Sequence, residues 1–197
     1  MNGAAPTVEN CTLTDNHNDT SGCTVHCDYY SSVTVRNCII WGNDCDFSVD
    51  WYLAPWEIIV EYSNLENGFT GPGNISADPL FVTGPEGDYC LSQVAAGQAA
   101  DSPCLDTGSQ AASSACWTVG GETDCLDNRS TRTDEIADAG TVDMGFHYPA
   151  LNLASAGFGC TPASGTLPFT TSLTATMTNN HPSEIRRFAG RIDVKLA

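Results

Sequence analysis

A repeated decapeptide constrains the fold of this chain more than any other feature. The segments TVENCTLTDN at 7–16, TVRNCIIWGN at 34–43 and IVEYSNLENG at 59–68 follow one another at spacings of 27 and 25 residues. Apolar residues alternate within each copy, as in short strands, and Gly, Asn, Asp and Ser fill the intervals. Strand-and-turn sequence with this period predicts a solenoid, in which each coil buries its inner face by stacking on its neighbours.

The same register makes a local prediction about two cysteines. Stacked copies place Cys11 and Cys38 at equivalent positions one coil apart, with their side chains facing the same way. We expect a disulfide between them, which requires their Cα atoms to lie within about 7 Å of each other. The apolar positions that we expect on the inner face are Val8, Cys11 and Leu13 in the first copy, Val35, Cys38 and Ile40 in the second, and Ile59, Val60 and Leu65 in the third.

Three further motifs follow the repeats in order. They are GNISADPLFV at 73–82, GDYCLSQVAAGQAADSPCLDTGS at 87–109 and DEIADAGTVDMGFHYP at 134–149. Together with the repeats, this series resembles the C-terminal coils and cap of right-handed parallel β-helix repeat proteins of bacterial surfaces. The resemblance implies the fold and an exported setting. It implies no single activity, because such proteins range from lyases to adhesins.

The last part of the chain, residues 150–197, has a different pattern. In TLPFTTSLTATMTN (166–179) and IRRFAGRIDVKLA (185–197) apolar and polar residues alternate, which predicts two half-buried strands. With GFGCTP (157–162) they resemble the opening hairpin of a β-sandwich module. We therefore expect an all-β chain, with a short right-handed parallel β-helix and its cap in residues 1–149 and a C-terminal antiparallel β appendage in residues 150–197.

Charge limits the partners of the chain. The net charge is −17, and it divides into −19 for residues 1–150 and +2 for the remainder. Such a body repels nucleic acids and anionic lipids, and no apolar run approaches the roughly 18 residues of a membrane span. The expected partners are identical copies in a head-to-tail assembly or the rest of a longer chain, together with cations and a neutral polysaccharide.

The ten cysteines predict an oxidising, extracellular or cell-surface setting. The opening MNGAAPTVEN is no signal peptide, so the signal was removed or the chain comes from a longer one. We expect disulfides Cys90–Cys104 and Cys116–Cys125, each closing a short loop, while the partners of Cys23, Cys27, Cys45 and Cys160 stay open. In HNDTSGCTVHC (17–27) the order does not match haem attachment, and disulfides are favoured over a zinc site.

Two clusters near residue 50 are candidate sites. Asp44, Asp46 and Asp50 offer oxygen ligands to a structural calcium ion, the only cofactor that we expect, and less well the carboxylates of a glycoside hydrolase. Trp41, Trp51, Tyr52 and Trp56 offer aromatic faces on which sugar rings stack. The alternative is that these aromatic side chains cover the solenoid.

Catalysis finds little support in these residues. A uronate lyase needs basic groups around the substrate carboxylate, and the solenoid offers only Arg36. The sequence favours a non-catalytic extracellular surface or assembly protein, such as a filament, matrix or adhesion module. The alternative is a carbohydrate-binding module or glycoside hydrolase fragment that acts on a neutral plant or microbial polysaccharide.

Overall fold

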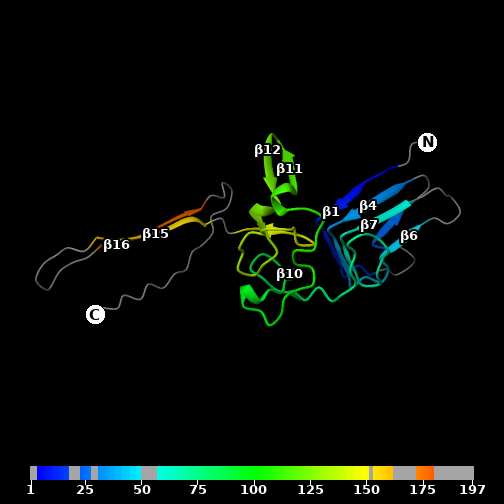
Figure 1. Cartoon of the computed structure of the whole chain (residues 1–197), viewed down its shortest axis with the longest axis horizontal. Coiled ribbons are helices and arrows are strands. Elements are labelled where there is room, and N and C mark those ends of the chain that lie inside the picture. Colours follow the sequence, from blue (N-terminus) through cyan, green and yellow to red (C-terminus); the bar gives the residue numbers. More distant parts are fainter. Residues whose placement is uncertain are drawn as a thin grey trace, which may run out of the picture. The chain divides into compact units, whose positions relative to one another are not determined.

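A computed structural model describes residues 4–17, 23–27, 31–49, 57–150, 153–161 and 172–179 (Figure 1). These residues form strands, turns and three short 3₁₀ helices, so the fold is all-β. The chain divides into two compact units, Met1–Leu151 and Asn152–Ala197.

Short parallel sheets form the first part of the first unit. One sheet has the order β1 (Thr7–Glu9), β4 (Ser32–Arg36), β7 (Glu57–Glu61). A second has the order β2 (Thr12–Thr14), β5 (Ile39–Trp41), β8 (Asn64–Leu65), and β3 (Val25–Cys27) pairs with β6 (Phe47–Val49). In Figure 1, β1, β4 and β7 lie side by side.

The strand registers follow the sequence repeat. Thr7 lies opposite Thr34, and Thr34 lies opposite Ile59, so the three decapeptides pair position by position. We call the segments that begin at these residues repeats 1, 2 and 3. Thr12, Ile39 and Asn64 are matched in the same way in the second sheet.

A sharp corner separates the first two strands of each repeat. Asn10, Asn37 and Tyr62 occupy it with φ of 53°, 52° and 47°. This left-handed conformation is one that asparagine tolerates better than most residues. Beside the corner, the Arg36 guanidinium bonds to the carboxylate of Glu9 over 2.9 Å and to that of Glu61 over 3.1 Å. Adjacent repeats are therefore also joined by opposite charges.

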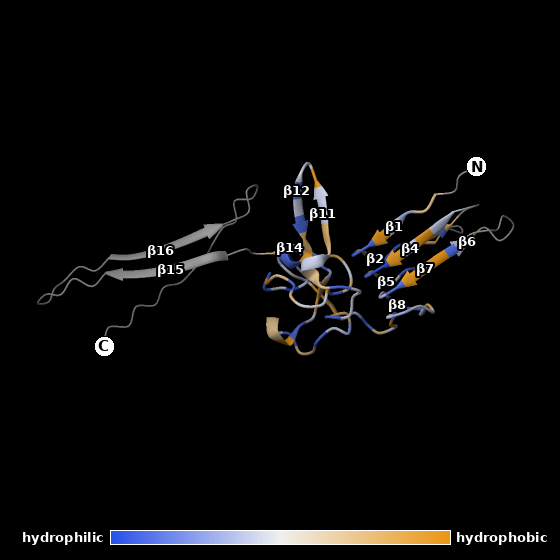
Figure 2. Ribbon diagram, turned by 45° about the horizontal axis from the view of Figure 1, so that its top comes forward, coloured by the Kyte–Doolittle hydropathy of each residue, from blue (hydrophilic) through white to orange (hydrophobic). Residues whose placement is uncertain are grey.

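The main core lies between the parallel sheets. Val8, Cys11 and Leu13 of repeat 1, Val35, Cys38 and Ile40 of repeat 2, and Val60 and Leu65 of repeat 3 all belong to one apolar cluster. Apart from Ile59, these are the positions expected from the repeat. The hydropathy colouring in Figure 2 shows the hydrophobic stretches of β1, β4 and β7 next to one another.

Strand β5 is buried on both faces. Ile39 and Ile40 are both 0% exposed, and their side chains point to opposite sides because they are strand neighbours. Ile40 joins the main core, whereas Ile39 packs with Leu91, Cys104 and Met144 in a second cluster. The segment after the repeats, residues 69–150, therefore covers the outer face of this strand. We call it the covering segment.

That covering segment consists of short antiparallel pairs. β9 (Phe81–Val82) pairs with β10 (Cys90–Leu91), β11 (Cys116–Val119) with β12 (Glu122–Cys125), and β13 (Arg129–Ser130) with β14 (Tyr148–Pro149). The 3₁₀ helices are η1 (Val94–Ala96), η2 (Ala112–Ser114) and η3 (Leu126–Asn128). A third small cluster of Ala112, Ala115, Leu126 and Val142 holds the last two helices.

Two glycines allow the covering segment to approach the repeats closely. Gly145 has φ of +96°, and a Cβ atom there would lie 2.8 Å from Ile39 Cδ1. The Gly145 N–H donates to the Asn37 carbonyl over 2.8 Å. A Cβ atom at Gly108 would lie 2.6 Å from the Val142 carbonyl oxygen and 3.1 Å from Asn37 Oδ1. A larger residue at Gly145 would force the segment away from Ile39, and one at Gly108 would clash first with Val142 of the same segment.

The second unit contains one described hairpin. β15 (Leu153–Thr161) pairs antiparallel with β16 (Ser172–Asn179), within the strand expected at 166–179. The strand expected at 185–197 lies outside the described residues.

Candidate functional site

The densest group of buried ionisable side chains lies in the covering segment. Asp138, Asp143 and His147 are 8%, 4% and 2% exposed. Asp138 Oδ2 lies 2.9 Å from His147 Nε2 and accepts the Asp143 N–H over 3.0 Å. Asp143 accepts the Asp106 N–H on Oδ1 over 2.8 Å, and its Oδ2 accepts the Thr131 hydroxyl. The group therefore connects the loop at 104–109 to residues 131–147.

The proton positions follow from the acceptors. His147 Nδ1 lies 3.1 Å from the Gly145 carbonyl, which can only accept, so Nδ1 carries a hydrogen. Burial, and then the negative charge of Asp138, raise the pKa of Asp143 to about 6. Its carboxyl group is thus partly protonated in weakly acidic solution.

These carboxylates meet the distance requirement of a metal site but not its other needs. Ligand atoms of Asp106, Asp138 and Asp143 lie within 4.8 Å of one another. Yet the oxygens of the two buried acids accept hydrogen bonds from Asp106 N–H, Thr131, Asp143 N–H and His147. A cation would displace those donors. Nor does substrate reach acids that are this deeply buried, so their arrangement suits fixing the covering segment in place.

Of the acids expected to bind calcium, only two fall in the described residues. Asp44 bonds to His17 Nδ1 over 3.1 Å, and Asp50 lies outside the described residues. Asp46 is 8% exposed, and burial, with the nearby Glu66 charge as a smaller cause, raises its pKa. Asp46 Oδ1 is buried without a hydrogen-bond partner, and so is Thr24 Oγ1. In the described part of the chain, Asp46 is the stronger candidate for a cation ligand.

Thr24 and Asp46 are also neighbours in the parallel ladder. The Thr24 N–H donates to the Cys45 carbonyl and the Val25 N–H to the Asp46 carbonyl, each over 2.9 Å. Val25 lies opposite Phe47, so the residues before them, Thr24 and Asp46, are also opposite each other. The two unpartnered oxygens therefore belong to stacked residues.

The expected aromatic platform is described at one residue only. Trp41 is partly buried and packs against the cluster of Ile39, Leu91, Cys104 and Met144. Its side chain therefore packs, like that of Ile39, against the segment that covers the outer face of β5. Trp51, Tyr52 and Trp56 lie outside the described residues.

Of the three expected disulfides one is present, and two are absent because Cys11, Cys38, Cys90 and Cys104 are free thiols. Cys116 is bonded to Cys125, and Cys23 is bonded to Cys45, a pair that the sequence had left open. The expected bond between Cys90 and Cys104 is absent, since both are free thiols. Leu91 packs in the same cluster as Cys104, so its strand neighbour Cys90 points to the opposite face. The thiol of Cys104 instead accepts the Asn64 Nδ2–H over 3.1 Å.

Two cysteines of the repeats, Cys11 and Cys38, are free thiols at matched positions. Their thiols influence each other, which lowers the pKa of Cys11 to about 7 and raises the pKa of Cys38. Cys27 is also a free thiol, and its Sγ–H donates to the Ser31 carbonyl over 3.2 Å.

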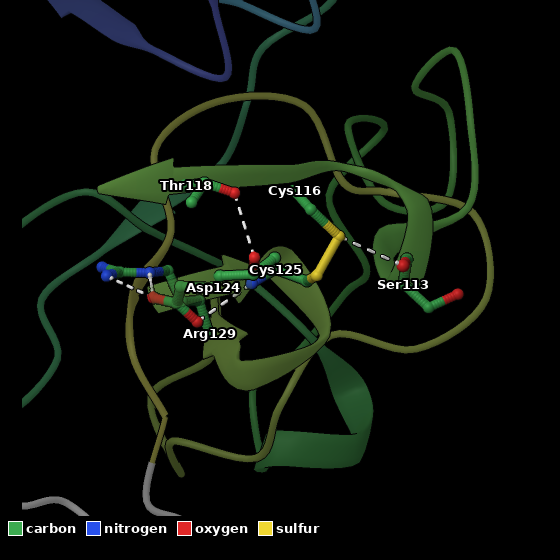
Figure 3. Close-up of a disulfide and its surroundings, with 7 residues drawn as sticks. Ser113, Cys116, Thr118, Asp124, Cys125 and Arg129 are labelled. Atoms are coloured by element: carbon green, nitrogen blue, oxygen red, sulfur yellow. Dashed lines mark hydrogen bonds and ion pairs between the residues drawn. A yellow bond between two sulfur atoms is a disulfide. The ribbon is translucent and has the colours of Figure 1, made fainter. Parts of the chain in front are cut away.

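The disulfide Cys116–Cys125 closes the β11–β12 hairpin at its base (Figure 3). Arg129 donates from Nη2 to Asp124 over 2.8 Å, and its guanidinium lies 4.9 Å from the centre of the Trp117 ring. Further out, Val119 is 72% exposed. The base of the hairpin is thus held covalently while an apolar side chain remains in solvent.

In the described part of the chain, β6 and β7 each have a neighbouring strand on one side only. The same holds for β1, β2 and β3, which form one open end of the parallel sheets. A cavity of about 440 Å³ lies at these strands, lined largely by apolar side chains that include Val8, Leu13, Val25, Cys27 and Val33. No helix in the described residues is long and apolar enough to cross a membrane.

The sequence pointed to the motifs of the covering segment without assigning its acids a role. Asp106 lies in SPCLDTG, and Asp138 and Asp143 lie in DEIADAGTVDMG. What could have identified them is that each Asp stands two residues before a glycine. Comparison with known proteins found no family model, no curated protein and no solved structure that matches the chain.

Proposed function

We propose that this chain is a non-catalytic extracellular structural protein that assembles with identical copies through the open end of its parallel sheets. In this proposal the parallel sheets are the coils of a short right-handed parallel β-helix, the fold that the motifs resemble. The one-sided pairing of β1, β2 and β3 beside the 440 Å³ cavity carries the proposal. Strands with a free edge are templates for another chain.

The backbone of β1 shows which groups are free. The N–H groups of Ser32 and Thr34 donate to the carbonyls of Ala4 and Pro6, and the Asn10 N–H donates to the Arg36 carbonyl. Even-numbered residues therefore face β4. Because backbone groups alternate in direction along a strand, those of Thr7 and Glu9 face outward. They are available to a further strand.

Charge supports a second copy as the occupant. The body of −19 attracts the C-terminal segment of +2, so contact between different ends of two copies is favoured over contact between like ends. A contact between unlike ends that does not close into a ring builds a filament. Two disulfides in the described residues are compatible with an extracellular setting.

Light scattering over a range of protein concentrations, at low and at moderate salt, tests the proposal. We expect the mass to rise with concentration and fall with added salt. Thr7→Pro removes an outward N–H and should abolish the rise of mass with concentration. Thr7→Val keeps that N–H and should still show the rise. Arg191→Glu with Lys195→Glu should also weaken association. A folded monomer at every concentration would contradict the proposal, and it is the outcome expected if a longer polypeptide covers this edge instead.

A further inference from the structure

Cys11, Cys38 and Ser63 occupy the same position in repeats 1, 2 and 3. Each precedes one of the matched residues Thr12, Ile39 and Asn64. Each side chain donates to the carbonyl two residues earlier: Cys11 Sγ to Glu9 over 3.1 Å, Cys38 Sγ to Arg36 over 3.1 Å, and Ser63 Oγ to Glu61 over 2.9 Å. In each repeat this hydrogen bond spans the left-handed corner residue, which lies between the donor and the acceptor, and stabilises its conformation. A hydroxyl does this in repeat 3, so the corner itself does not require sulfur.

The two thiols interact. The influence of the Cys38 thiol lowers the pKa of Cys11 to about 7, against the effect of burial. The same interaction, with burial, raises the pKa of Cys38 well above its usual value. Cys38 is 0% exposed, whereas Cys11 is partly exposed. Cys11 therefore combines thiolate character with access to solvent, as reactive cysteines do.

Another pair of matched cysteines on neighbouring parallel strands is already joined by a disulfide. Cys23 and Cys45 are the residues two positions before the matched Val25 and Phe47, and their Cα atoms are 4.7 Å apart. Adjacent parallel strands thus bring matched cysteines into bonding range. Cys11 and Cys38 are related by the same one-repeat step in the neighbouring sheet.

We propose that Cys11 and Cys38 are an oxidisable thiol pair that reacts with a low-molecular-weight disulfide and forms a second covalent link between repeats 1 and 2. The Cys11 thiolate attacks one sulfur of the small disulfide, and the other sulfur leaves as a thiolate. Cys38 then loses its proton and attacks Cys11 Sγ, which releases the second small thiolate. Two protein thiols are oxidised, and one disulfide is reduced to two thiols.

Two of the other free thiols, Cys90 and Cys104, provide internal controls. Burial raises the pKa of Cys104 to about 11, and burial also raises the pKa of Cys90. Cys104 lies in the cluster with Ile39, on the other face of β5 from the main core. Neither thiol stacks on a matched cysteine. Reaction should therefore select Cys11 and Cys38.

The test is incubation of the folded protein with glutathione disulfide, followed by alkylation and peptide mass mapping. A protein isolated with the link already formed is first reduced under mild conditions that leave Cys23–Cys45 and Cys116–Cys125 intact. We expect a cross-linked peptide that contains Cys11 and Cys38, while Cys90 and Cys104 remain open to alkylation after unfolding. The initial rate should rise with pH and reach half its maximum near the pKa of about 7.

Serine variants separate the two steps of the reaction. They are expected to fold, because Ser63 occupies the same position in repeat 3. Cys38→Ser should stop at one glutathione on Cys11, because no second thiol displaces it. Cys11→Ser should leave Cys38 unmodified, and Cys104→Ser should leave the cross-link unchanged. The proposal is overturned if Cys11 and Cys38 both stay free in the folded wild type, if the mixed disulfide on Cys11 persists there, or if Cys104 reacts equally fast.

Discussion

Asn37 Nδ2 donates a hydrogen bond to Asn10 Oδ1 over 3.1 Å, across the 27 residues that separate the same corner in repeats 1 and 2. Asn37 Oδ1 accepts the Ser109 N–H over 2.8 Å, so one amide joins the repeats to each other and to the covering segment. Asn37 is 1% exposed. Its side chain therefore meets both of its partners away from water.

This arrangement predicts a large effect for Asn37→Ala. The variant loses two partly buried hydrogen bonds and a residue that tolerates a left-handed φ, which together should lower the free energy of unfolding by about 3 kcal/mol. Asn10→Ala loses one of those bonds at a more exposed corner and should cost about 1 kcal/mol. Urea denaturation measures both values. Equal losses in the two variants would show that the contact with Ser109 contributes little.

Arg36 should matter through its two partners. Replacing it with Met removes both ion pairs and leaves Glu9 and Glu61 without an intervening positive charge, at a cost of about 1 kcal/mol. The difference between wild type and Arg36→Met should shrink as salt is added, because these side chains are partly exposed. Arg36→Lys keeps the charge and should lose less. A salt-independent difference would assign the effect to packing of the arginine stem.

Asp143 predicts a pH dependence of stability. Its pKa is raised to about 6 in the folded chain, so the folded state binds this proton more tightly than the unfolded state. The contribution is complete at about pH 4 and is lost as the pH rises through about 6. Asp143→Asn keeps an acceptor for the Asp106 N–H and cannot ionise.

The measurement is the free energy of unfolding, taken from melting curves of wild type and Asp143→Asn at a series of pH values. The wild type should lose stability relative to the variant between about pH 4 and pH 7, by at most about 3 kcal/mol. Subtracting the two curves removes the titration of the other acids. A flat difference would mean that the Asp143 pKa is not raised by folding.

Asp46 predicts an effect of calcium. Its unpartnered Oδ1 belongs to the residue stacked on Thr24, whose Oγ1 is also unpartnered. Neighbouring strands lie about 4.8 Å apart, and a calcium ion about 2.4 Å from each oxygen fits that spacing. Calcium at millimolar concentration should raise the melting temperature of the wild type, and a chelator should reverse the rise. Asp46→Asn should abolish the response.

Asp44→Asn is the control for that experiment, since Asp44 is engaged with His17. It should retain the calcium response. If both variants respond like the wild type, calcium binds elsewhere. If the wild type itself is unaffected, Asp46 is a buried carboxyl group without an ion.

The sequence by itself determined the parts of this protein that depend on local pattern and on the repeat. The spacings of 27 and 25 residues match the strand registers, and the alternation within each copy identifies the side chains of the main core. Both follow because side chains alternate along a strand and identical positions stack in a parallel ladder. The bond Cys116–Cys125 was accessible for a similar reason, because a short hairpin brings its own ends together.

Contacts between distant, non-repeating segments were decided only by the tertiary structure. Ile39 and Ile40 look equivalent in the sequence, yet one packs in the main core and the other under the covering segment. The bond expected between Cys90 and Cys104 is absent because strand alternation turns Cys90 away, and the close approach of Gly145 to Ile39 was not evident from either local sequence. No local pattern encodes which outer face a later segment will cover. That choice depends on the total apolar area and hydrogen bonding that the docked segment gains.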